Sequence, residues 1–212
     1  MPRRAHPLFA RWYPGFAAPL EPRGLGERRA RLLAPLTGRV LEVGCGHGVN
    51  FPHYPAAVTD LVAVEPEARL RDLARERAAA LERDVTVLDG QAEALPLESG
   101  SFDAVVTTLV LCSVEDQDRA LAEIHRVLKP GGRLWCLEHV ASSNRAVRAG
   151  ERVFDAAFWS HAFGGCRTGR ETGAAIARAG FDTAGLAPRR YPDLPFPLSV
   201  SPHLIGSARK PA

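Results

Sequence analysis

Three glycines, Gly44, Gly46 and Gly48, follow directly on a run of apolar residues that ends at Val43. Glycines at the end of a buried strand let the backbone bend sharply and bring its amide groups close to a bound ligand. The spacing G-x-G-x-G differs from the G-x-G-x-x-G of dinucleotide-binding loops, and no Lys-Ser or Lys-Thr pair follows, which excludes a P-loop. We therefore predict a nucleoside-type binding loop, followed by a helix.

Two acidic residues flank this loop at positions that discriminate between nucleoside ligands. Glu42 lies two residues before Gly44, and we expect it to face the crevice at the end of the first strand. A carboxylate there repels a pyrophosphate but attracts the ammonium and sulfonium groups of S-adenosylmethionine. Glu65 closes the second strand, 21 residues after Gly44, where a carboxylate can accept hydrogen bonds from both ribose hydroxyls. Together these residues favour S-adenosylmethionine over NAD as the cofactor.

The segment Val40–Asn50 resembles motif I of the class I S-adenosylmethionine-dependent methyltransferases, and Glu65-Pro66 resembles their second motif. Three later segments, Gly90–Leu97, Ser101–Val106 and Arg126–Gly132, are similar to the third, fourth and post-fourth segments of that superfamily. The resemblance implies a methyltransferase that uses S-adenosylmethionine and leaves S-adenosylhomocysteine as product. It also implies a Rossmann-like, doubly wound α/β fold with a seven-stranded, mostly parallel sheet and an antiparallel C-terminal strand pair.

In that superfamily the loop after the third strand holds the adenine ring. Many members carry Asp at the position of Gln91, so the resemblance implies that adenine is contacted here by Gln91 or by the backbone amide of Ala92. The cofactor-binding residues expected from all these patterns are Glu42, Gly44, Cys45, Gly46, Gly48, Asn50, Glu65, Pro66, Gln91, Ala92, Glu93, Thr108 and Leu109.

The methyl acceptor is expected in the crevice beyond the carboxyl ends of the fourth and fifth strands. His139 ends the fifth strand and is the candidate general base, because an imidazole titrates near the operating pH of most enzymes. The alternative is that His139 has no catalytic role and is simply hydrogen-bonded at the end of the strand. A thiol acceptor needs little help from a base, since its ordinary pKa of about 8.5 already leaves some thiolate at neutral pH.

Aromatic and sulfur-containing side chains are the other candidates for the acceptor pocket, with plain core packing as the alternative for each. Trp12 and Tyr13 belong to an N-terminal aromatic group that we interpret as a cap or lid over the cofactor. The substrate-binding residues expected are Trp12, Tyr13, Cys112, His139, Phe158 and Cys166. The four cysteines lie far apart in the sequence, without the close pairs usual in structural zinc or redox sites. We therefore expect reduced thiols and no metal site.

A narrower resemblance concerns the acceptor. The segments Leu109–Val114, Glu138–Val140, Gly165-Cys166, Arg170-Glu171 and Pro202–Gly206 look like the group that includes the vertebrate thiol S-methyltransferases and bacterial relatives often labelled phospholipid methyltransferases. The resemblance implies transfer to a small, rather apolar thiol, with a membrane-lipid amine as the competing acceptor. The hydrophobic N-terminal anchor of the vertebrate members is not expected here.

Two alternative functions remain at this point. One is a phospholipid-amine or quinone-type methyltransferase, and the other is a catalytically silent module that binds the cofactor for a partner protein. NAD-dependent oxidoreduction is disfavoured by the glycine spacing and by Glu42.

The elements that must position these residues alternate between strands and helices, which is typical of a parallel sheet wound with helices. Nearly continuous apolar runs predict strands buried on both faces. These strands are Arg39–Val43, Leu61–Glu65, Val85–Leu88, Phe102–Thr107 and Arg133–His139. Helical periodicity predicts Glu67–Leu81 and Gln117–Leu128, with Lys129–Gly132 forming a tight turn before the fifth strand.

The two ends of the chain complete the expected domain. Residues 1–37 form the N-terminal cap or lid, with a helix over Glu27–Leu33, and residues 38–212 form the methyltransferase domain. Helices are expected over Val147–Phe163 and Arg170–Ala179, and an antiparallel pair near Phe181–Leu186 and His203–Ala208. The connection between that pair is expected to be irregular because it contains Pro188, Pro192, Pro195, Pro197 and Pro202.

Composition limits the function classes further. The chain has 212 residues, 46% of them apolar and 24% charged, with a net charge of +3. This excludes a disordered chain, and the apolar runs are too short to cross a bilayer. Basic residues are dispersed, so no nucleic acid partner is expected, while peripheral lipid contact remains open. Prolines interrupt the N-terminal segment where a signal peptide would lie, so we expect a cytoplasmic protein with a small-molecule acceptor.

Overall fold

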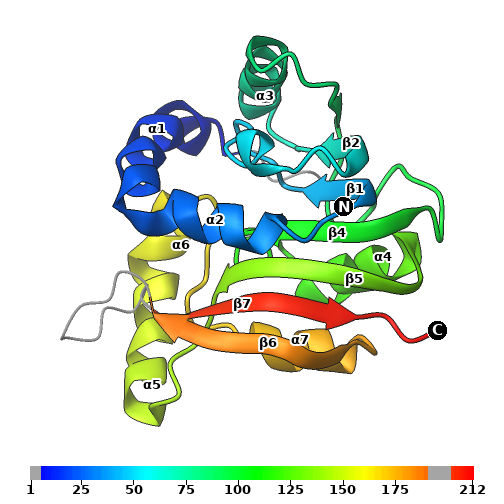
Figure 1. Ribbon diagram of the computed structural model, residues 1–212. Helices are drawn as coiled ribbons and strands as arrows, with labels where there is room; N and C mark the ends of the chain where they lie inside the picture. The colour runs from blue at the N-terminus through cyan, green and yellow to red at the C-terminus, as the bar shows by residue number, and fades with distance from the viewer. Residues whose placement is uncertain (1–5, 191–201) are drawn as a thin grey trace.

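The computed structural model describes residues 6–190 and 202–212 of the 212-residue chain (Figure 1). Seven strands form one sheet in the order β3-β2-β1-β4-β5-β7-β6. All neighbours pair in parallel except β5–β7 and β6–β7, which are antiparallel. The strands are β1 (Gly38–Val43), β2 (Val58–Val64), β3 (Thr86–Leu88), β4 (Phe102–Thr108), β5 (Leu128–His139), β6 (Asp182–Arg190) and β7 (Pro202–Arg209). The predicted α/β fold class is therefore confirmed.

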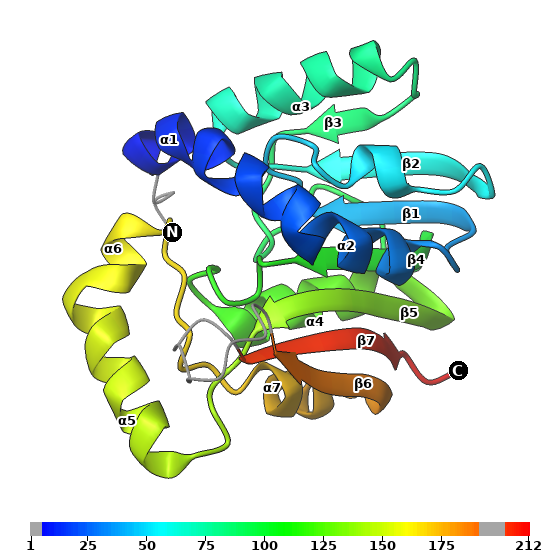
Figure 2. The ribbon, with the colours of Figure 1, turned by 60° about the vertical axis from the view of Figure 1, so that its left-hand side comes forward.

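Helices cover both faces of this sheet, as the continuous apolar strands require. The helices are α1 (Pro7–Ala17), α2 (Gly26–Leu33), α3 (Ala68–Ala80), α4 (Gln117–Val127), α5 (Arg145–Phe154), α6 (Ser160–Ala162) and α7 (Thr172–Arg178). α2 lies on one side of the sheet and α4 and α7 on the other (Figures 1 and 2). α1 and α6 lie toward the edge where the parallel strands end (Figure 2).

Alternate residues of one strand supply the two cores because successive side chains point to opposite faces. In β1, Leu41 packs in the cluster that contains the apolar residues of α4 and α7, whereas Val40 packs in the cluster that contains Leu33 of α2 and Ala74 of α3. Both β1 side chains are fully buried. The central strands are thus held from both sides, which fixes the position of the loops that follow them.

The segment after the glycine loop differs from the prediction. Instead of a helix it contains turns and a single 3₁₀ turn over Phe51–His53. Pro52 is tolerated at the start of such a turn, whereas Pro55 disfavours a helical conformation of Tyr54, whose ψ of 129° ends the turn.

The expected turn at Lys129–Gly132 is also different, because β5 already begins at Leu128. Leu128 pairs with Phe102, and the register then shifts before Arg133 pairs with Ala104. The segment is a bulged start of the strand.

The C-terminal strands are longer than predicted, and two of the prolines expected to prevent regular structure lie inside them. Pro188 is in β6, which is the edge strand of the described sheet and pairs there with β7 alone, and Pro202 is the first residue of β7. Proline is compatible with an edge or a strand start because no ladder hydrogen bond is lost there. The expected irregularity around Pro192, Pro195 and Pro197 lies outside the described residues.

Residues Val147–Phe163, expected as one helix, form α5, then a π-helical turn over Asp155–Trp159, then the short α6. A membrane-crossing helix, one both long and apolar enough, is not found in residues 6–190 and 202–212.

Candidate active site

A cavity of about 450 Å³ opens where β1, β2 and β4 end. Its size falls within the ~300–1,000 Å³ of pockets that hold small molecules. Val43, Val64 and Thr108, the last residues of these three strands, all contribute to its wall. This is the place in an open parallel sheet where ligands bind. Of the expected cofactor residues, the wall contains Gly44, Cys45, Gly46, Glu65, Pro66, Gln91, Ala92, Glu93, Thr108 and Leu109.

The glycine loop forms the floor of the cavity and requires its glycines. Gly44, Gly46 and Gly48 have φ angles of +67°, +56° and +75°, a region that favours glycine. The N–H groups of Gly44 and Cys45 both donate to the carbonyl of Val64, which joins the loop to the end of β2. A Cβ added at Gly46 would meet only Tyr13, at 4.0 Å, so open space lies above this residue.

Glu65 is fixed by two backbone donors at the mouth of the loop. Its Oε2 accepts from Gly46 N–H at 2.8 Å, and its Oε1 accepts from Glu67 N–H at 2.9 Å. Burial raises the pKa of Glu65 to about 6, although the hydrogen bonds from Glu67 and Gly46 work in the opposite direction. Each carboxylate oxygen has a second lone pair, so the group can still accept hydrogen bonds from two ligand hydroxyls.

Glu42 does not face the crevice, contrary to the sequence prediction. Its carboxylate accepts from Asn50 Nδ2 and from the Tyr54 hydroxyl, each at 2.9 Å, and the side chain is buried beneath the loop. Burial raises the pKa of Glu42 to about 7, opposed by those two hydrogen bonds. Of the expected cofactor residues, Glu42, Gly48 and Asn50 are not part of the cavity wall that the described residues form.

Arg29 on α2 is a cavity residue that was not among those expected from the sequence. Its side chain is buried, and Nη1 donates to Asn50 Oδ1 and Thr108 Oγ1, both at 2.9 Å, while Nε pairs with Glu21 at 3.2 Å. The sequence does contain a pattern that indicates a role for Arg29, because this residue shares a helical face with Leu25, Leu32 and Leu33, which are all buried. A charged residue on an apolar helix face needs a charged or polar partner.

The strand end after β4 carries backbone strain. Leu109 lines the cavity with φ +61°, which is unusual for a residue other than glycine, and its N–H donates to Leu137 O on β5. Such conformations concentrate at functional sites.

His47, inside the glycine loop, supplies an unpartnered polar atom. Its Nδ1 is buried without a hydrogen-bond partner among the described residues, and its side chain lines the cavity. Burial, with help from the nearby Arg77 and Arg29, lowers the pKa of His47 to about 4, so the ring is neutral at pH 7. This orphaned atom, the carboxylate of Glu65 and the open space above Gly46 fit a ligand with sugar hydroxyls and further polar groups.

The N-terminal aromatic residues divide between the cavity and the surface. Phe9 and Tyr13 line the cavity and stack on each other, with ring centroids 4.6 Å apart. Trp12 instead packs edge to face on Phe163 and is 37% exposed, and Phe158 is 58% exposed. Of the expected substrate residues, only Tyr13 belongs to the cavity wall that the described residues form.

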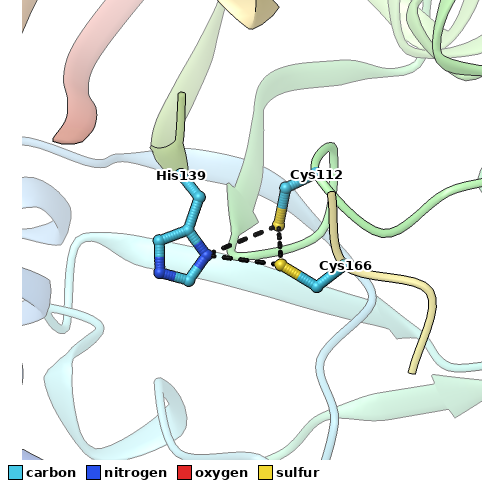
Figure 3. Close-up of side chains that lie close together, drawn as sticks. All are labelled: Cys112, His139 and Cys166. Atoms are coloured by element: carbon cyan, nitrogen blue, oxygen red, sulfur yellow. Dashed lines mark hydrogen bonds between the residues drawn. The ribbon is translucent and has the colours of Figure 1, made fainter. Parts of the chain in front are cut away.

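The remaining three expected substrate residues, Cys112, His139 and Cys166, are not part of the wall that the described residues form, but they lie close together (Figure 3). Cys112 Sγ and Cys166 Sγ are 3.6 Å apart, and His139 Nδ1 lies 3.8 Å and 3.5 Å from them. Their separation in the sequence gave no sign of this contact. The shared hydrogen bond between the sulfurs lowers the pKa of the Cys166 thiol, with help from His139, and raises the pKa of the Cys112 thiol.

Comparison with known proteins agrees with this architecture. The methyltransferase domain family matches residues 41–136. The human thiol S-methyltransferase TMT1A is 37% identical over 81% of this chain and 70% of its own, and human TMT1B is 34% identical over 96% of this chain and 88% of its own. A SAM-dependent methyltransferase from Thermotoga maritima superposes with a TM-score of 0.70, at 24% identity, over 95% of this chain and 97% of that one.

The seven-stranded fold, the glycine loop and Glu65 at the next strand end therefore define an S-adenosylmethionine-dependent methyltransferase of class I. Within that class, the chain belongs to the family of the thiol S-methyltransferases TMT1A and TMT1B.

Proposed function

We propose that this enzyme transfers the methyl group of S-adenosylmethionine to a small, apolar thiol. The observation that carries the proposal is the similarity to TMT1A and TMT1B, which extends over 81% and 96% of the chain and thus beyond the cofactor-binding segment. The apolar side chains of Phe9, Val110 and Val114 on the cavity wall support an apolar acceptor.

Cofactor binding is proposed to use four groups of the wall. The Glu65 carboxylate accepts from the ribose hydroxyls, and the Gln91–Ala92 segment contacts adenine. Arg29, buried at the end of β4, binds the methionine carboxylate, because a guanidinium pairs best with a planar anion. Gly46 lets the ligand approach the backbone.

When bound, S-adenosylmethionine would supply a methyl group on a sulfonium sulfur, and the neutral thioether S-adenosylhomocysteine is an excellent leaving group. The residues of this chain then have to align the acceptor and exclude water, and alignment alone can contribute roughly 7–11 kcal/mol. Phe9 and Tyr13 cover the cavity for this purpose. Burial raises the pKa of Tyr13, which therefore stays a neutral phenol.

His139, the base expected from the sequence, is not proposed as the base for the acceptor. Its Nδ1 is occupied by the two sulfurs of Cys112 and Cys166, and it lies outside the described cavity wall. A thiol acceptor is consistent with this arrangement because a small fraction of it is already thiolate at neutral pH without a base, its ordinary pKa being about 8.5.

The organisation of the chain is proposed as a cap over residues 1–37 on a methyltransferase domain over residues 38–212. α1 and its aromatic side chains at the cavity support this division. We further propose a cytoplasmic enzyme with a small-molecule acceptor and without a nucleic acid partner, supported by the dispersed basic residues.

The acceptor is tested by measuring S-adenosylhomocysteine release with small alkyl thiols, phosphatidylethanolamine vesicles and demethylated quinone precursors. Turnover of thiols alone is expected. If the enzyme methylates only the phosphatidylethanolamine of the vesicles or only the quinone precursors, that compound class is the acceptor and the thiol proposal is wrong. No product with any of the three, combined with intact cofactor binding, would support a catalytically silent cofactor-binding module instead.

A further inference from the structure

Cys112, His139 and Cys166 bring three metal-ligating atoms together from three separate segments (Figure 3). Cys112 lies in the loop after β4, His139 ends β5, and Cys166 follows α6. The two sulfurs and the ring nitrogen all lie within 4.8 Å of one another. Cys112 and Cys166 are buried, and His139 is half-buried.

The distances between these atoms match those around a tetrahedral zinc ion. Zn–S bonds of about 2.3 Å and Zn–N bonds of about 2.0–2.1 Å at tetrahedral angles give S···S and S···N separations of about 3.8 Å and about 3.6 Å. The observed S···S separation is 3.6 Å, and the S···N separations are 3.5 Å and 3.8 Å. A disulfide would need its sulfurs at about 2.05 Å, so the sulfurs would have to move much further to form one.

The surrounding structure holds the Cys112 side of the cluster in place. The buried carboxylate of Glu138 accepts from the N–H groups of Val110, at 3.1 Å, and Cys112, at 3.3 Å. The Arg170 guanidinium donates to the carbonyl of Leu111 at 2.7 Å. The loop is therefore positioned without any metal, as a preorganised ligand set requires.

The Cys166 side is tied to the same loop. Arg167 N–H donates to the carbonyl of Cys112 at 2.8 Å, and Cys166 N–H donates to Phe163 O at 3.0 Å. The two cysteine segments thus face each other across a backbone hydrogen bond as well as through their sulfurs. Small movements suffice to seat an ion between them.

We propose that Cys112, His139 and Cys166 form a zinc site with two thiolate ligands, one imidazole ligand and a fourth position for a non-protein ligand such as water. Thiolate and imidazole donors suit zinc, whereas magnesium and calcium prefer oxygen. Binding forms two Zn–S bonds and one Zn–N bond, releases the two thiol protons to solvent and changes no oxidation state. This site replaces the metal-free expectation drawn from the spacing of the cysteines.

Zinc at this position would join the loop after β4, the end of β5 and the segment after α6. Ser113, Gly165 and Arg167, next to the ligands in sequence, line the cofactor cavity. The ion would therefore stiffen the part of the cavity wall that Ser113, Gly165 and Arg167 form. The proposal is independent of which acceptor is methylated.

The experiment uses the full chain produced in zinc-supplemented medium and measures bound metal by elemental mass spectrometry. One zinc per chain is expected in the wild type. Cys112→Ala and Cys166→Ala each remove a ligand and are expected to lower the zinc affinity about 100-fold or more. The matched control is Cys136→Ala, since Cys136 is an equally buried cysteine in β5 outside the cluster, and it is expected to retain the zinc.

A measurement on the wild type alone keeps the test independent of variant folding. After removal of zinc with a chelator, added Co²⁺ is expected to give thiolate-to-cobalt charge-transfer absorption and the visible bands of tetrahedral cobalt. Chelation is also expected to lower the Tm of the wild type but not that of Cys166→Ala. The proposal is overturned if the wild type holds no zinc and gives no cobalt spectrum. It is equally overturned if the isolated chain carries a Cys112–Cys166 disulfide in place of a metal.

Discussion

The backbone N–H of Gly46 donates a 2.8 Å hydrogen bond to Oε2 of Glu65, which joins the glycine loop after β1 to the end of β2. The same carboxylate is proposed to hold the cofactor ribose. Loop conformation and ligand recognition are therefore coupled through one side chain.

The first prediction follows from this coupling. Glu65→Ala removes the acceptor of the ribose hydroxyls and is expected to weaken S-adenosylhomocysteine binding by on the order of 1–3 kcal/mol. Isothermal titration calorimetry measures the change, with Glu76→Gln on the exposed face of α3 as control. Equal affinity of Glu65→Ala and the wild type would remove the ribose assignment.

The second prediction concerns the pH dependence of cofactor binding. The pKa of Glu65 is raised to about 6, and only the carboxylate form accepts from both ribose hydroxyls. S-adenosylhomocysteine affinity is therefore expected to rise about tenfold from pH 5 to pH 7. The same titration with Glu65→Gln is expected to be flat over this range. A profile that is identical in the two proteins would contradict the prediction.

The third prediction concerns Glu42 and stability. Because burial raises the pKa of Glu42 from its ordinary 4.5 to about 7, the folded state favours the protonated acid. The raised pKa of Glu42 adds on the order of 3 kcal/mol to the free energy of unfolding. This stabilisation is fully present below pH 4.5 and is lost as the pH rises through about 7. In Glu42→Gln, whose amide is always neutral, the free energy of unfolding should fall less between pH 5 and pH 8. Urea titrations across this range measure the difference, and parallel profiles would refute it.

A matched pair of glycine substitutions forms the fourth prediction. Gly48→Ala would place a Cβ 2.6 Å from the buried ring of Phe51 at φ +75°, whereas Gly46→Ala meets only Tyr13 at 4.0 Å. Backbone strain costs about 1–2 kcal/mol in both, and overpacking adds about 1–3 kcal/mol in Gly48→Ala alone. Gly48→Ala is expected to lower the Tm more, and Gly46→Ala to lose cofactor affinity with a smaller change in Tm. Equal losses of Tm would count against the described loop geometry.

The fifth prediction separates recognition by Arg29 from its structural role. Arg29→Gln is expected to weaken S-adenosylhomocysteine binding about tenfold or more through a lost charge-assisted hydrogen bond. A decarboxylated analogue of the ligand should bind Arg29→Gln and the wild type with similar affinity. Arg31→Gln, on the exposed face of the same helix, is the control. If both ligands lose affinity equally in Arg29→Gln, the residue positions the site without touching the carboxylate.

The parts of the site that sequence predicted well depend on local chain geometry. The glycine loop and Glu65 both follow apolar strands directly, so their placement at one edge of the sheet follows from the parallel order of the strands. The placement of Glu42 was wrong because alternation along β1 could equally send its carboxylate into the core, where Asn50 and Tyr54 receive it.

The parts that sequence could not predict depend on contacts between distant segments. Arg29 reaches Thr108 across 79 positions, and Cys112 reaches Cys166 across 54. Neither spacing corresponds to a helix turn, a hairpin or a known ligand motif. For the same reason the aromatic residues of α1 could be expected near the cofactor as a group, whereas only the structure separates Tyr13 in the wall from Trp12 outside it.

The position of β7 between β5 and β6 governs the order in which this sheet can be completed. While the chain is synthesised from its N-terminus, β5 keeps an open edge and β6 has no partner until Pro202–Arg209 emerges from the ribosome. Unpaired strand edges invite association between nascent chains. β7, which is made after both β5 and β6, thus closes the edge of β5 and gives β6 its partner in the described sheet, and so limits association between nascent chains.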